Sequence, residues 1–348
     1  MKKGQVRIKD IATEAGVSVT TVSYILNNSP SQTFAPETIE RVNGAARKLG
    51  YVPNMAARAL VSDNSRMLGV VIPQTEPHKE FMFSNPFYGD FLSSVEYTAR
   101  QNGYHILISG TNADQTYLEV ARTRSLDGII IVGMYPEGYY AELKKTGIPT
   151  ALVDCYCDDD YFPAIHIDDC RGGYLATKYL LDKGHRVIAH VTGLIKDHGV
   201  NQQRMLGWRR ALEEAGAGYD RSLLYDGEVS YEYGAEAGKR IAENFRESGV
   251  SAAFVSADIT ALGLYNGLRT AGATIPSDIS VVSFDGTWLS GVCDPGLTTI
   301  RQDVALKGKT AVEVILSLID GGLPGNQKIT LPISLVERGS VREVKCDG

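Results

Sequence analysis

The sequence predicts an α/β protein in which a small all-α helix-turn-helix headpiece precedes a two-lobed core of doubly wound parallel sheets. Three observations favour this fold class. The chain has 348 residues, more than one ordinary domain. Helical spacing dominates residues 1–50, and from Met67 onward apolar runs of strand length alternate with amphipathic helices. With 43% hydrophobic and 22% charged residues, the composition excludes disordered and fibrous classes.

Residues 8–26 have the spacing of two short helices joined by a tight turn. Ala12 lies where the two helices would approach most closely, Gly16 suits the left-handed turn that ends the first helix, and Val22 would fill the angle between them. Ser18 is the expected N-cap of the second helix. The pattern therefore predicts a helix-turn-helix.

A third helix is expected from Pro36 to about Leu49, because proline is favoured at a first helical position. Pro53 then interrupts the helical pattern, and the alanine-rich residues up to Leu60 suffice for only about two turns. So short a helix is marginal alone. Residues 51–65 are therefore predicted to form a linker that becomes helical only when it is held.

The rest of the chain alternates predicted strands and helices. Strands are expected near residues 68–73, 104–109, 128–132, 150–153, 164–167, 187–191, 252–255 and 280–283. Helices fit between them, for example at residues 87–102, 172–183, 202–215, 232–247 and 259–271. So many strands favour two similar lobes with a cleft between them. Ligands in such folds bind at the carboxyl ends of the strands.

Charge is distributed unevenly along the chain. Residues 1–62 carry eight lysines and arginines against four acids, a net charge of +4, which leaves −10 on the other 286 residues. A basic module on an acidic body predicts that the module, and not the body, binds a polyanion.

Several classes of protein are disfavoured. No run approaches the ~18 apolar residues of a membrane helix, and charged residues follow Met1-Lys2-Lys3 where a signal peptide would be apolar. We therefore expect a cytoplasmic protein with no membrane partner. The five cysteines are too irregularly spaced for a disulfide framework, and Cys155-x-Cys157 lacks zinc spacing. Gly308-Lys309-Thr310 lacks the first glycine of a P-loop, and no catalytic constellation is present. We expect no metal, no cofactor and no enzymatic activity.

The motifs resemble those of the lactose/galactose-repressor family of bacterial transcription regulators. The resemblance covers essentially the whole chain and is most specific in the helix-turn-helix and in the segment that follows it. It rests on Val6 to Ala12, Ala15 to Ser18, Thr21 to Ser23, Leu26-Asn27, Tyr51 to Leu60, Gly184-His185-Arg186, Arg204, Gly207, Ala261-Leu262-Gly263, Ser283-Phe284-Asp285, Pro295, Leu297 to Gln302 and Leu335 to Ser340.

The resemblance implies a domain organisation and partners. Residues 1–50 would form a DNA-binding headpiece, residues 51–65 a hinge helix and linker, and residues 66–348 an effector-binding and dimerisation core resembling periplasmic sugar-binding proteins. Its N-lobe would comprise about residues 66–167 and 301–331, and its C-lobe about residues 168–300 and 332–348. A homodimer would bind a near-palindromic operator in double-stranded DNA. Only eight residues follow Ser340, without heptads, so a tetramer through a coiled coil is not expected.

The recognition helix would be Ser18 to Leu26, and the resemblance implies roles for its exposed side chains. Val19, Thr20 and Ser23 are candidates for base edges and phosphates, and a valine can touch thymine methyl groups. Tyr24 departs from the arginine common at this position, so the preferred base pair there is open. The other DNA-binding candidates are Lys9, Ser18, Thr21 and Asn27, and in the hinge Asn54, Ala57 and Leu60, with Leu60 placed as a wedge in the minor groove. A plain interdomain linker is the alternative to this hinge.

For the effector, a sugar or related small metabolite, the family-matched anchors are Arg204 and Asp285. A guanidinium and a carboxylate can each form paired hydrogen bonds with vicinal hydroxyls, although these two could instead form a salt bridge across the cleft. Further candidates are Phe87, Tyr88, Asp169, Asp258 and Gln302, and Trp288 has a standing similar to that of the two aromatic residues.

Two other departures from the family pattern mean that the effector cannot be inferred from a relative. The loop from Gln74 to Ser84 is long, and Ala257 replaces a common pocket asparagine. The third helix also lacks a serine cap, since Ala35 occupies that position, at a cost of about 1 kcal/mol. The main alternative function is a sugar-binding transport module without DNA binding. A carbohydrate-active enzyme on the same fold is a more remote alternative.

Overall fold

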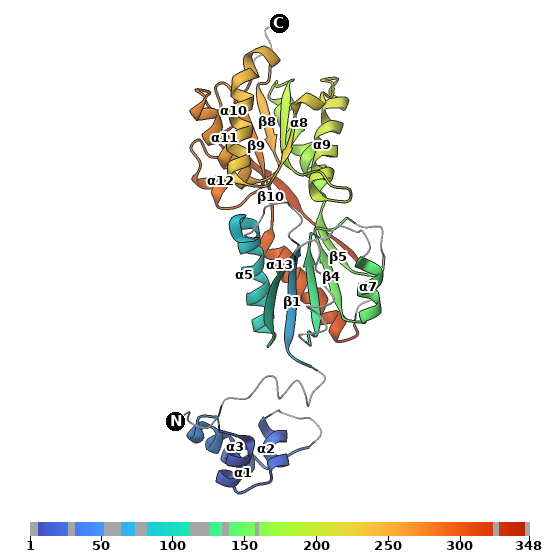
Figure 1. The fold of residues 1–348 in the computed structure, drawn as a ribbon, viewed down its shortest axis with the longest axis vertical. Coiled ribbons are helices and arrows are strands. Elements are labelled where there is room, and N and C mark those ends of the chain that lie inside the picture. The colour runs from blue at the N-terminus through green and yellow to red at the C-terminus, as the bar shows by residue number, and fades with distance from the viewer. Residues whose placement is uncertain are drawn as a thin grey trace. The chain divides into compact units, whose positions relative to one another are not determined.

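The computed structural model describes residues 6–26, 32–51, 64–73, 82–111, 125–133, 139–156, 160–322 and 327–344. The chain divides into two compact units, residues 1–65 and residues 66–348 (Figure 1).

The described residues of the first unit form the helices α1 (Ile8–Ala15), α2 (Val19–Leu26) and α3 (Pro36–Leu49). Gly16 ends α1 with a left-handed φ of 65°, and the Oγ of Ser18 accepts a hydrogen bond from the backbone N–H of Thr21 at 3.0 Å. Ala12 and Val22 are buried between the helices. The predicted helix-turn-helix and its serine cap are confirmed. Ala35 precedes α3 without a side-chain cap, as the sequence indicated.

The first sheet of the second unit has the order β11-β5-β4-β3-β1-β2, and all its paired strands are parallel. Its strands are β1 (Met67–Pro73), β2 (His105–Thr111), β3 (Gly128–Val132), β4 (Thr150–Val153), β5 (Ala164–Ile167) and β11 (Lys328–Leu331). Helices α5 (Pro86–Gln101) and α13 (Val304–Ile319) cover one face, and α7 (Tyr139–Thr146) covers the other. A short 3-10 turn, Met82–Ser84, precedes α5.

The second sheet has the order β12-β10-β9-β8-β6-β7. Its strands are β6 (Ile188–Gly193), β7 (Leu224–Gly227), β8 (Ala252–Val255), β9 (Ser280–Asp285), β10 (Thr298–Gln302) and β12 (Ile333–Val336). Helices α8 (Asp169–Asp182) and α9 (Val200–Glu214) lie on one face, and α10 (Tyr231–Ser248), α11 (Asp258–Thr270) and the short α12 (Leu289–Val292) lie on the other (Figure 1). A 3-10 turn, Arg221–Leu223, precedes β7.

The eight predicted strands are all present, and the structure adds β7, β10, β11 and β12. These four mix polar and apolar residues, so they lack the continuous apolar run that marks a strand buried on both faces. Strand β12 pairs antiparallel with β10 at the edge of an otherwise parallel sheet. The chain passes from the first sheet to the second after β5, returns after β10 and passes over again between β11 and β12. Side chains at these crossings are therefore placed close to both sheets.

Candidate functional site

A pocket lies at the carboxyl ends of the strands of the second unit. It holds about 650 Å³ of empty space, including its opening to solvent. Strands β3, β8, β9 and β10 end at it, as expected for a doubly wound fold. Its wall consists of Asn85, Phe87, Tyr88, Val132, Gly133, Asp154, Val200, Asn201, Arg204, Val229, Ser256, Ala257, Asp285 and Gln302.

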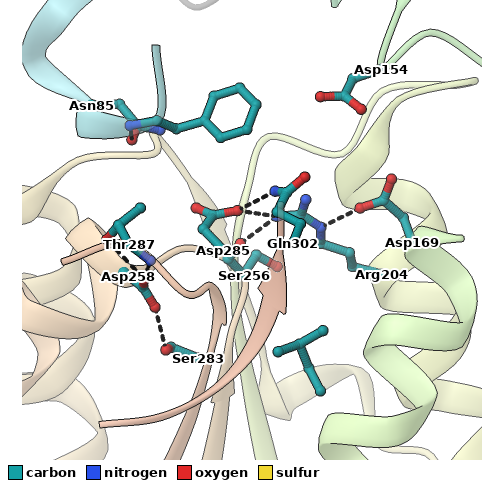
Figure 2. A network of polar contacts seen from close by, with 12 residues as sticks. Asn85, Asp154, Asp169, Arg204, Ser256, Asp258, Ser283, Asp285, Thr287 and Gln302 are labelled. Atoms are coloured by element: carbon teal, nitrogen blue, oxygen red, sulfur yellow. Dashed lines mark hydrogen bonds and ion pairs between the residues drawn. The ribbon is translucent and has the colours of Figure 1, made fainter. Parts of the chain in front are cut away.

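Arg204, on α9, is the central cation of the pocket wall and is 7% exposed. Its Nε donates to Asp169 Oδ1 at 2.7 Å, and its Nη1 donates to the backbone oxygen of Ser256 at 2.5 Å (Figure 2). The guanidinium carbon lies 3.7 Å from the centre of the Phe284 ring. Three different contacts thus fix the plane of the guanidinium before any ligand arrives.

Asp169 begins α8 behind this arginine and is fully buried. Its Oδ2 accepts a hydrogen bond from the Tyr156 hydroxyl at 2.6 Å. Burial raises the pKa of Asp169, and the neighbouring Arg204 offsets part of that rise. Asp169 is absent from the pocket wall, so it orients the arginine and does not face the cavity.

Glycines allow α8 and α9 to approach closely enough for this ion pair. A Cβ on Gly207 would lie 2.0 Å from the backbone oxygen of Cys170, and one on Gly173 would lie 2.2 Å from that of Arg204. Both helices therefore touch through their backbones. Any larger residue at either position would move Arg204 away from Asp169.

Asp285 ends β9 at the pocket, with a strained φ of 101°. Its Oδ1 accepts a hydrogen bond from Gln302 Nε2 at 2.8 Å and lies 3.7 Å from Arg204 Nη1 (Figure 2). The two anchors predicted from the sequence are thus brought together as a loose ion pair. This is the salt bridge that the sequence left open as the alternative to effector binding. Both of them also line the cavity.

Lys307 lies behind Gln302, fully buried on α13. Its ammonium donates to both carboxylate oxygens of Asp154, at 2.6 and 2.8 Å, and to Gln302 Oε1 at 2.5 Å. The sequence reasoning missed Lys307 and Asp154. Helical spacing could have found the lysine, because it lies three residues after Val304 and four before Ala311, both of which are buried.

Asp258 is held entirely by its own chain. Its carboxylate accepts hydrogen bonds from the hydroxyls of Ser283 and Thr299 and from the backbone and hydroxyl of Thr287, at 2.5–3.0 Å. Burial raises its pKa to about 7. Asp258 is absent from the pocket wall, and the geometry makes it a support for the turn after β9.

The aromatic candidates separate into two groups. Phe87 and Tyr88 line the pocket at the start of α5, where Asn85 caps the helix by accepting from the Phe87 backbone N–H at 3.0 Å. Trp288 is 62% exposed and is not part of the wall. Asn85 and Asn201 are polar wall residues that the sequence reasoning did not select. Residues 74–81 of the long loop lie outside the described residues.

The candidate DNA-binding residues gather on the first unit. Lys9, Ser18, Val19 and Thr20 are exposed, and the valine keeps 47% of its surface accessible although it is apolar. Thr21, Ser23 and Tyr24 are half-buried, and the tyrosine ring stacks on Phe34 with centroids 6.5 Å apart. Asn27, Asn54, Ala57 and Leu60 lie outside the residues that the structure describes.

The described residues contain neither a membrane-crossing helix nor a cluster of metal-ligating side chains. No helix among them is both long enough and apolar enough to cross a membrane. They also contain no group of three or more His, Cys, Asp or Glu side chains placed to ligate a metal ion.

Comparison with known proteins identifies the family. Residues 7–54 match the model of "Bacterial regulatory proteins, lacI family", and residues 177–341 match that of "Periplasmic binding protein-like domain". The chain is 34% identical to the transcriptional regulator DegA of Bacillus subtilis, over 96% of this chain and 97% of the relative. It is 30% identical to catabolite control protein A of Priestia megaterium, over 97% and 99%.

Solved structures agree with these relatives. The lac repressor dimer bound to operator and the anti-inducer ONPF superposes with a TM-score of 0.83 at 26% identity, covering 97% of this chain and all of that one. The complex of the transcriptional regulator CelR with cellobiose superposes with a TM-score of 0.70 at 25% identity and the same coverage. The chain therefore belongs to the lacI family of bacterial regulatory proteins.

Proposed function

We propose that this protein is a DNA-binding transcription regulator, acting as a repressor, whose operator affinity is set by a sugar or related small metabolite in the pocket. The observation that carries the proposal is the pairing of Arg204 with Asp285 in the wall of a cavity that belongs to a lacI-family chain. A guanidinium donor beside a carboxylate acceptor suits adjacent hydroxyl groups.

Each effector candidate has a role in this proposal. Arg204, Asp285 and Gln302 bind hydroxyls, and the rings of Phe87 and Tyr88 cover an apolar sugar face. Asp169 and Asp258 do not contact the effector in this proposal. Asp169 positions Arg204, and Asp258 positions the turn that follows Asp285. The lining residues support this division, because neither of these two carboxylates faces the cavity.

DNA would be bound by α2 in the major groove of an operator, with a second copy of the chain on the other half-site. Val19, Thr20 and Ser23 would meet base edges, and Lys9, Ser18, Thr21 and Asn27 would help to fix the helix on the phosphates. Tyr24 has a smaller reach, because its ring packs on Phe34. In the hinge, Asn54, Ala57 and Leu60 would enter the minor groove. The relative solved as a dimer on its operator supports this arrangement.

The alternative, a transport-type sugar-binding module, has no use for the first unit. Residues 7–54 of that unit match the lacI-family model, and the relative DegA, matched over 96% of this chain, is a transcriptional regulator. We therefore place this alternative second.

Selection from a pool of random double-stranded oligonucleotides tests the DNA function. The full-length chain should enrich one near-palindromic sequence, and its affinity should fall steeply as salt rises from low to moderate concentration. Thr20→Ala should weaken binding to the enriched sequence about tenfold, whereas Thr270→Ala, at another exposed threonine, on α11, should not. Enrichment of no sequence would refute the proposal.

A further inference from the structure

Building on the proposed function, we infer that the pocket takes an uncharged polyhydroxylated effector and rejects phosphorylated or carboxylated analogues of the same sugar. The observation behind it is the balance of charge around the cavity. Within the described part of the chain, the charged side chains of the wall are Arg204, Asp154 and Asp285. Asp169 and Lys307 lie directly behind them.

The two cations, Arg204 and Lys307, are already paired with carboxylates of the protein, so neither is available to neutralise an anionic ligand. Arg204 forms a close ion pair with Asp169 and a looser one with Asp285, at 2.7 and 3.7 Å. Lys307 is paired with Asp154 at 2.6 Å, and its side chain is 1% exposed. Three carboxylates thus surround two cations, and both carboxylates of the wall face the cavity. A phosphate entering here would meet net negative charge in a poorly solvated site.

Lys307 also fixes which polar groups the cavity presents. An ammonium has three protons and accepts nothing, and all three have acceptors: the two oxygens of Asp154 and the Oε1 of Gln302. The amide of Gln302 must therefore turn its Nε2 toward Asp285, where it donates at 2.8 Å. The orientation of the glutamine follows from its buried neighbour and does not depend on the ligand.

Within the Arg204–Asp285 pair, two atoms are left for the ligand. Arg204 Nη2 and Asp285 Oδ2 have no hydrogen-bond partner among the residues that the structure describes, whereas Nε, Nη1 and Oδ1 are engaged. One is a donor and the other is an acceptor. Since a hydroxyl both donates and accepts, two adjacent hydroxyls satisfy this pair without bringing charge. A phosphate or carboxylate satisfies only the donor and leaves its charge beside Asp285.

A thermal-shift and calorimetry panel on the full-length protein tests the inference. It contains neutral pentoses, hexoses and disaccharides, each beside its phosphate ester or uronic acid. At least one neutral sugar should raise the Tm, and its charged counterpart should bind at least tenfold more weakly. A charged member that binds as tightly as its neutral partner would overturn the charge selectivity and leave metabolite sensing intact. A panel in which nothing binds would overturn the sugar assignment as well.

Variants separate charge selectivity from general damage. Asp285→Asn removes one negative charge of the wall at nearly constant size, so the ratio of phosphate-ester affinity to neutral-sugar affinity should rise at least tenfold. Asp154→Asn should move this ratio in the same direction, and it provides the readout if Asp285→Asn does not fold. The control is Asp182→Asn, an exposed carboxylate on α8 paired with Lys178, which should leave the ratio unchanged. Unchanged ratios in both wall variants would contradict the inference.

Discussion

Asp169 accepts a hydrogen bond from the Nε of Arg204 at 2.7 Å, and both side chains are buried. The carboxylate comes from the first turn of α8 and the guanidinium from α9. The two helices lie on the same face of the second sheet, and α8 therefore holds the pocket cation that α9 supplies. The Tyr156 hydroxyl, which follows β4 of the first sheet, holds the other oxygen of the same carboxylate. The orientation of Arg204 therefore depends on residues from both sheets.

Asp169→Asn should weaken effector binding at least tenfold although residue 169 does not line the pocket. The amide keeps the size of the side chain but removes the charge opposite the buried Arg204, which should also cost about 2 kcal/mol of stability. Calorimetry with a bound sugar and urea unfolding measure the two effects. Effector affinity equal to that of the unmodified chain would show that Asp169 does not position the arginine.

Gly207→Ala should destabilise the second unit by roughly 2–3 kcal/mol, because the added methyl group would collide with the backbone of α8. Gly89→Ala is a matched control on α5, where nothing lies within 4 Å of the added Cβ. There alanine should stabilise the helix by about 0.5–1 kcal/mol, since glycine is the poorer helix former. Chemical unfolding of both variants compares them, and equal effects would refute the close packing of α8 and α9.

His190 should make the protein less stable in mild acid. Burial between Trp208 and Phe254 lowers its pKa from 6.5 to about 3, so below pH 6.5 the unfolded chain binds a proton that the folded chain does not. Stability is therefore lost as the pH falls from 6.5 toward 3, by about 2 kcal/mol at pH 5.

Other groups contribute to the same pH range, so variants are needed to isolate His190. Burial lowers the pKa of His185 to about 4 and adds to the loss, whereas the raised pKa of Asp258, about 7, opposes it because the folded state then binds the extra proton between pH 4 and 7. Urea unfolding across pH should show a flatter profile for His190→Gln than for the unmodified chain. His198→Asn, at an exposed histidine, should leave the profile as it was. A His190→Gln profile as steep as the original would contradict the assignment.

Ala35→Ser should stabilise the headpiece by about 1 kcal/mol. Residue 35 has the extended backbone of an N-cap but no side-chain acceptor for the free N–H groups of α3. Hydrogen exchange of the α3 amides should slow about fivefold in the serine variant. Ala35→Val supplies no acceptor and should give no protection, so equal protection by the two residues would refute a capping effect.

Much of the fold could be predicted because local patterns agree with the final structure. Gly16, Ser18 and Pro36 mark the helix ends of the first unit through their own backbone preferences, and apolar runs of strand length mark the eight strands that were predicted. Strands β7, β10, β11 and β12 were not predicted, since they mix polar residues with apolar ones.

The pocket was predictable only in part. Arg204 and Asp285 were found through family motifs. Asp258 was also predicted to bind the effector, but its carboxylate accepts four hydrogen bonds from the protein itself and does not face the pocket. Lys307 and Asp154 lie 153 residues apart in the sequence, and only the return of the chain after β10 brings them together. No local pattern carries that information.

The most direct test measures the affinity of the full-length chain for its selected operator with and without a saturating sugar that raises its Tm. Allosteric coupling typically changes affinity by about 5- to 150-fold, so a change of at least fivefold is predicted, and Arg204→Lys should abolish it by removing the planar donor group. An operator affinity that stays constant while the sugar fills the pocket would contradict the coupling between effector and DNA.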